Sequence, residues 1–207
     1  MHRLFIVNSW GWFAAGTTTM LEIIIQGRGG QGAQTAGTLL AKAFFSEGKY
    51  VQSFATYGGA RRGTPVSSFI RIDDRPIRLR CDIEHPHAIL CFDASLLQGK
   101  LLDCATADTL IVVNSTKPAD QYRSLGDFHI FPIDGLSIAR DCGLGRIVNS
   151  TLLGALACAL QAPDIGTMQK TISAAMADKT AGNIRACLGG FDHAREIIQR
   201  ESIGVSA

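Results

Sequence analysis

The feature that most constrains this chain is a glycine-rich turn between an apolar run and a helical pattern. Residues 21–26 (LEIIIQ) form a short, nearly continuous apolar run, which is typical of a buried parallel strand. Residues 33–46 (AQTAGTLLAKAFFS) then repeat apolar side chains at helical spacing. The hexapeptide GRGGQG between them satisfies G-x-G-x-x-G. This order of strand, turn and helix predicts the first unit of a Rossmann-like fold.

Strand and helix patterns alternate along the rest of the chain. We predict further strands over residues 50–57, 66–72, 87–92, 109–113 and 128–133, and helices over 152–160, 164–177 and 181–200. The turn DDRP after residue 72 predicts a small hairpin, in which a short strand over residues 77–80 pairs with the preceding one. The predicted fold class is therefore α/β, with a Rossmann-like open, mostly parallel sheet, helices on both faces and a hairpin insertion.

Composition excludes several classes of protein. The 207 residues are 46% hydrophobic and 18% charged, with a formal net charge of +2, as expected for a globular chain without strong attraction to nucleic acid or to a membrane. No apolar stretch is long enough to span a bilayer. We expect residues 20–207 to form a single Rossmann-like domain, preceded by an N-terminal extension over residues 1–19, which lacks the charge and continuous apolar core of a signal peptide.

The cysteines and histidines predict neither a metal site nor a catalytic site on this chain. None of the six cysteines forms a Cys-x-x-Cys pair, and their spacing matches neither a zinc site nor an iron–sulfur motif. Cys91 and Cys158 stand in apolar runs, so we expect buried, reduced thiols and a cytoplasmic location. The five histidines are scattered, and no serine stands in a G-x-S-x-G elbow. Asp82, Glu84, His85 and Asp93 form a polar group that we interpret as a solvated edge or a subunit contact.

The glycine turn allows three interpretations: close packing of strand and helix, contact with an anion such as a CoA phosphate, or binding of NAD(P) or flavin. A standard NAD site adds an acidic residue at the end of the second strand, and residues 52–57 (QSFATY) contain none. The adjacent Arg61 and Arg62 can hold a phosphate or carboxylate instead, although such a pair is also common in solvated loops and interfaces. The candidate binding residues, as possible CoA contacts, are Gly27, Arg28, Gly29, Gly30, Gln31, Gly32, Arg61 and Arg62.

Together these segments resemble a known family. The stretch from GRGGQGAQTAGTLLAKAFF through YGGARRGTPVSSFIRIDDRPI is similar to the gamma subunit, or gamma domain, of the pyruvate and related 2-oxoacid:ferredoxin oxidoreductases. The segment NSTLLGAL over residues 149–156 is similar to the family's Asn-x-x-x-Leu-Gly-Ala segment. One departure is Gly58-Gly59-Ala60, where members often have Gly-Pro-Glu before the paired arginines. The chain also lacks the cysteine-rich ferredoxin module that is fused to some relatives.

The resemblance implies a role as a non-catalytic subunit. Such complexes use thiamine diphosphate, Mg²⁺ and [4Fe-4S] clusters, all held by other subunits, to oxidise a 2-oxoacid to an acyl-CoA. The gamma subunit borders the CoA channel and carries no cofactor of its own. The implied partners are alpha, beta and ferredoxin-like delta subunits of an enzyme of anaerobic metabolism, with ferredoxin or a flavin/NAD subunit as electron acceptor.

Two alternatives stay open at this point. The RRGTPV pattern resembles the pyruvate-type branch of the family more than its 2-oxoglutarate-type branch, which implies a pyruvate-type substrate, but an aryl 2-oxoacid such as phenylglyoxylate or indolepyruvate fits the same subunit. A different class of function, a stand-alone NAD(P)- or flavin-dependent reductase, fits the glycine turn taken alone.

Overall fold

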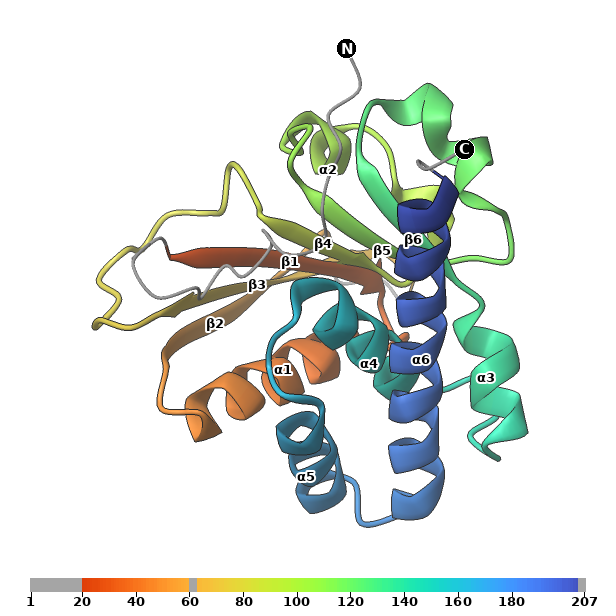
Figure 1. The fold of residues 1–207 in the computed structure, drawn as a ribbon. Helices are drawn as coiled ribbons and strands as arrows, with labels where there is room; N and C mark the ends of the chain where they lie inside the picture. The colour runs from red at the N-terminus through yellow and green to blue at the C-terminus, as the bar shows by residue number, and fades with distance from the viewer. Residues whose placement is uncertain (1–19, 60–62, 205–207) are drawn as a thin grey trace.

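A six-stranded sheet forms the centre of the molecule, seen edge-on in Figure 1. The structure is a computed structural model, and it describes residues 20–59 and 63–204. The strands lie in the order β2-β3-β1-β4-β5-β6. Their bounds are β1 Leu21–Arg28, β2 Tyr50–Tyr57, β3 Pro65–Asp73, β4 Ala88–Cys91, β5 Leu110–Asn114 and β6 His129–Ile133.

The sheet is mixed in direction. Strands β1, β4, β5 and β6 run parallel, as their apolar runs predict for strands buried between layers. Strand β3 is antiparallel to both of its neighbours, β1 and β2. The hairpin insertion is therefore made by β2 and β3, and the prediction of a strand over residues 77–80 is wrong. Both edges of β3 are already occupied, so no edge remains for that segment to pair with.

A buried arginine holds the segment after β3 across the sheet. Arg71 is 1% exposed, and its Nε donates to Glu22 on β1 at 2.7 Å. Its two terminal nitrogens donate to the carbonyls of Cys81 at 2.9 Å and Asp82 at 3.0 Å, and one also reaches the side chain of Gln52 on β2 at 3.0 Å. These bonds compensate the burial of the charge and explain why the segment lies over the sheet face instead of forming a strand.

The two faces of the sheet are covered differently (Figure 1). The long helices pack on one face, which we call the helical face, and there bury the larger apolar cluster. The opposite face packs against short segments and a smaller cluster. The predicted fold class, with helices on both faces, is confirmed. The longer helices are α1 Ala33–Ser46, α3 Gly135–Asp141, α4 Asn149–Leu160, α5 Ile165–Ala175 and α6 Thr180–Gly204. The short ones are α2 Lys100–Asp103, η2 Ala94–Leu96 and η3 Ala119–Leu125.

Glycines set the closest helix contact. A Cβ on Gly154 of α4 would lie 1.9 Å from the carbonyl oxygen of Cys187 on α6, and one on Gly190 would lie 1.9 Å from that of Thr151. The two backbones therefore approach closely, and α4 is buried along its whole length. Cys91 and Cys158 are buried as predicted, and burial raises the pKa of the Cys91 thiol to about 12. Within the described ranges, no helix is both long enough and apolar enough to cross a bilayer.

Candidate functional site: the glycine turn and its groove

The glycine turn joins the end of β1 to the start of α1. Gly30 and Gly32 have φ angles of +95° and +94°, a left-handed conformation that favours glycine. Gln31 closes the turn from both sides: its backbone N–H donates to the Arg28 carbonyl at 2.9 Å, and its side-chain oxygen accepts from the Arg28 N–H at 2.7 Å. The motif therefore has the backbone geometry that its sequence predicts.

Two of the glycines lie in tightly packed surroundings. A Cβ on Gly27 would lie 3.1 Å from the Cβ of Phe92 and 3.2 Å from that of Ala33. A Cβ on Gly32 would lie 2.4 Å from Nδ2 of Asn149, which donates to the Gly32 carbonyl at 3.1 Å. Asn149 belongs to the segment that resembles the family motif, and its role could not be read from the sequence because it starts a helix 117 residues further along.

The start of α1 is suited to an anion. Gly32 is the N-cap residue and makes no side-chain cap, so the first turn has no side-chain acceptor for its N–H groups. The partial positive charge of the helix dipole is concentrated at the same place. Backbone amides of this kind hold phosphate in many nucleotide sites.

Arg28 ties the turn to its surroundings. Its Nε lies 2.8 Å from Oδ2 of Asp93, and a terminal nitrogen donates to Oγ of Ser95 at 2.8 Å. Its other terminal nitrogen reaches the Gly63 carbonyl at 3.4 Å, while the N–H of Gly29 donates to the Thr64 carbonyl at 2.9 Å. The guanidinium thus connects the end of β4 with the loop between β2 and β3.

Asp93 is the charge partner of that arginine, a contact that its sequence position did not predict. Partial burial raises the pKa of Asp93, but hydrogen bonds from Ser95 and Arg28 outweigh burial, so the net pKa is below its usual range. The carboxylate also accepts from the backbone N–H of Ser95 at 3.0 Å, which caps η2. Asp93 follows the carboxyl end of β4, whereas Asp82, Glu84 and His85 precede its amino end. The predicted polar group is therefore divided by the strand.

A groove of about 840 Å³ opens at the turn. Its walls come from the turn, the first residues of α1, the end of β2 and the loop that leads into β3; they are Gly29, Gly30, Gly32, Ala33, Gln34, Thr35, Tyr57, Gly59, Thr64 and Val66. Arg61 and Arg62 lie outside the described residues, but Gly59 and Thr64 on either side of them line the groove. The structure thus brings the predicted turn and the ends of the predicted basic loop to one place.

A larger hollow of about 990 Å³ lies at the β6 edge of the sheet, between η3, β6 and α6. It contains none of the predicted site residues, and it mixes both charge signs, with Lys117, Arg123 and Arg200 near Asp127 and Glu196. Size alone does not make it the functional site, because it lacks the uncapped helix start and the glycine turn. Over the described part of the chain, no three His, Cys, Asp or Glu side chains gather to hold a metal ion.

Fold and site define a Rossmann-like subunit domain whose glycine turn faces an open groove, and the comparisons with known proteins place it more narrowly. Residues 22–196 match the model of the pyruvate ferredoxin/flavodoxin oxidoreductase family. The chain belongs to this family, as a gamma subunit.

Relatives and solved structures agree with that placement. Pyruvate synthase subunit PorC of Methanocaldococcus jannaschii is 40% identical over 74% of this chain and 84% of the relative. The pyruvate/ketoisovalerate oxidoreductases common subunit gamma of Thermococcus kodakarensis is 37% identical over 78% and 92%. The crystal structure of pyruvate oxidoreductase subunit PORC of Thermotoga maritima is 30% identical, with a TM-score of 0.74 over 85% of this chain and 97% of that one.

Proposed function

We propose that this chain is the gamma subunit of a thiamine-diphosphate- and iron–sulfur-dependent complex that oxidises pyruvate or a close 2-oxoacid to its acyl-CoA, and that its glycine-turn groove receives a phosphate group of CoA. The observation that carries the site is the groove itself, where an uncapped helix start meets the loop bearing Arg61 and Arg62. Both groups attract anions, and the CoA phosphates are anions.

The residues of this chain have binding and positioning roles in that proposal. The backbone N–H groups at the start of α1 donate hydrogen bonds to the phosphate oxygens, and the paired arginines neutralise the phosphate charge. Arg28 is a positioning residue, because it is occupied by Asp93 and Ser95 and reaches Gly63 in the basic loop. CoA supplies the thiol that takes the acyl group.

The cofactors of the complex belong to its other subunits in this proposal. Mg²⁺ and the [4Fe-4S] clusters are held in this proposal by partners of the alpha, beta and delta type. Ferredoxin is the proposed electron acceptor. The name of the Thermococcus relative describes a gamma subunit common to two oxidoreductases, which supports a substrate choice made outside this subunit.

The test is the kinetics of the whole complex carrying Arg61→Ala and Arg62→Ala, with Arg→Lys at both positions as the conservative control. Loss of a charge-assisted phosphate contact, about 1.5–3 kcal/mol, raises the KM for CoA by roughly 10- to 100-fold. We expect the KM for the 2-oxoacid and the kcat at saturating CoA to change little. An unchanged KM for CoA, combined with weaker assembly, would show that the loop only holds the subunits together.

A further inference from the structure

The two edges of the sheet differ in how they are protected. Strand β6 is short, with five residues. The N–H of Ser115, just after β5, donates to the Ile133 carbonyl at 2.9 Å, so the backbone N–H and C=O of Ile133 point toward β5. Because backbone groups alternate in direction along a strand, those of Pro132 point away from β5, and proline has no N–H to donate to an added strand. A short edge with an outward proline is a common protection against pairing with another chain.

Strand β2 lacks these protections. Its eight residues, YVQSFATY, include no charged residue and no proline, and among the described residues it pairs with β3 alone. The N–H of Gly58 donates to the Pro65 carbonyl at 2.9 Å, so the even-numbered residues bond to β3. Val51, Ser53 and Ala55 therefore direct their N–H and C=O groups outward. An eight-residue edge without charge or proline is a template for another strand.

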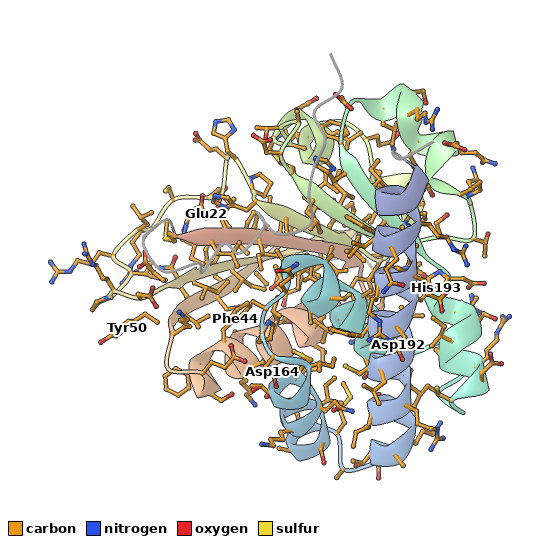
Figure 2. The ribbon with its side chains drawn as sticks, viewed as in Figure 1. Glu22, Phe44, Tyr50, Asp164, Asp192 and His193 are labelled. Atoms are coloured by element: carbon orange, nitrogen blue, oxygen red, sulfur yellow. The ribbon has the colours of Figure 1, made fainter. Side chains whose placement is uncertain are left out.

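Apolar surface gathers at the same edge. Of the six large hydrophobic side chains that are exposed in the described structure, Phe45, Tyr50 and Tyr57 lie on β2 or at the end of α1 leading into it. A fourth, Leu79, lies over β2, because its carbonyl accepts from the Gln52 side chain at 2.7 Å. Figure 2 shows Tyr50 at the outer margin of the sheet, on the side away from α6. Four of the six exposed large apolar side chains thus lie along one edge of the sheet, distributed over its two faces, which favours this edge as an interaction surface.

We infer that this edge binds a second copy of the chain, with the two β2 strands antiparallel about a two-fold axis at Ser53. In this register Ser53 faces Ser53, and Val51 faces Ala55 of the second copy, so the outward-directed groups pair with one another. A two-fold axis perpendicular to the sheet places facing residues of the two copies on the same face of the joined sheet. The register through Ser53 has this geometry. A charged residue on β2 would lie near the same charge of the second copy, which would weaken the pairing. Strand β2 contains no charged residue.

The same axis brings two exposed aromatic residues together. Gln34, Thr38, Ala41 and Phe45 recur at helical spacing on one stripe of α1, and the Tyr57 hydroxyl donates to the Gln34 side chain at 2.5 Å, so this stripe flanks β2. Phe45, 73% exposed, lies near the start of β2, and Tyr57, 58% exposed, lies at its end on the helical face. Antiparallel pairing places Phe45 of one copy beside Tyr57 of the other. Since Tyr57 lines the groove, the second copy borders it.

Sedimentation of the full chain tests the interface through Ser53→Lys. Ser137→Lys, at an exposed position of α3, is the matched control. We expect the wild type and S137K to sediment as dimers and S53K as a monomer, because two lysines then face each other on the axis. Circular dichroism confirms that each variant is folded. A wild type that stays monomeric at the highest soluble concentration would overturn the inference, whatever the outcome of the CoA experiment.

Cross-linking tests the register in the assembled complex. In a Cys81→Ser background, which removes the exposed native thiol, Ser53→Cys is treated with a short bismaleimide beside Ser137→Cys. We expect S53C to give a product of two gamma chains and S137C to give none. Linkage of S53C to a different subunit, or no gamma–gamma product, would show that the second copy is not the occupant of this edge.

Discussion

Replacing Gly32 by alanine tests how the glycine turn is held. At this position φ is +94°, and the added Cβ would lie 2.4 Å from Nδ2 and 2.7 Å from Oδ1 of Asn149. Asn149 is 4% exposed, so its side chain has little room to move away. Gly30 provides a matched control, because its φ of +95° is nearly the same and a Cβ there meets nothing within 4 Å.

Both substitutions place an alanine in the left-handed backbone region, but only Gly32→Ala also displaces the side chain of Asn149. An L-residue in the left-handed region costs about 1–2 kcal/mol, which we expect for Gly30→Ala. Gly32→Ala adds the displacement of Asn149 and the loss of its bond to the Gly32 carbonyl, a further ~1–2 kcal/mol. The total of about 2–4 kcal/mol is a large part of the stability of a typical domain.

Urea unfolding of the full chain measures both costs. The midpoint should fall further for Gly32→Ala than for Gly30→Ala at an unchanged denaturant slope. In an Asn149→Ala background the extra cost should disappear, because the group that the new Cβ meets has been removed. Equal destabilisation by the two alanines in the wild-type background would refute the role given to Asn149.

Two further predictions concern other contacts. Gly154→Ala should cost more than about 4 kcal/mol, because its Cβ would lie 1.9 Å from a backbone oxygen of Cys187 and force α4 and α6 apart; the thermal midpoint and soluble yield measure this. Asp93 has a lowered pKa in the folded state, so its stabilising effect is present above its unfolded pKa of about 3.9 and is lost as pH falls through the folded value. The urea midpoint should therefore decline less steeply below pH ~4 in Asp93→Asn than in the wild type. Equal declines in the two proteins would show that the Arg28–Asp93 ion pair does not stabilise the fold.

Local sequence pattern was sufficient for most of the fold. The predicted ranges 33–46 and 50–57 coincide with α1 and β2, because helical spacing and turn residues are local signals. The strand predicted over residues 77–80 failed for a non-local reason. Its alternating pattern is real, but β1 and β2 occupy both edges of β3, and Arg71 binds the carbonyls just beyond it. Neither fact can be read from the segment itself.

The candidate site was predictable in part. The glycine turn could be predicted from the sequence because the glycines, the strand and the helix lie within a few residues of one another. The Arg28–Asp93 pair joins residues 65 apart, and the Asn149 contact joins residues 117 apart, so both depend on strand order and helix packing. The family resemblance included the segment that begins at Asn149, but only the structure gives that residue a contact at the turn.

Strand order also explains why the turn lacks the acidic partner of a dinucleotide site. In the standard fold the second strand lies next to the first, and its end presents a carboxylate to the ribose. Here β3 lies between them, so the end of β2 is two strand spacings, about 10 Å, from β1. Because β3 is antiparallel, Pro65 pairs with Arg28, and the loop leading into β3 begins and ends at the groove. Gly59 and Thr64, which flank the paired arginines in the sequence, thus lie near the place where the standard fold presents its carboxylate. Arginine pairs with phosphate rather than with a ribose hydroxyl, which is consistent with the proposal of an anion such as a CoA phosphate at this groove.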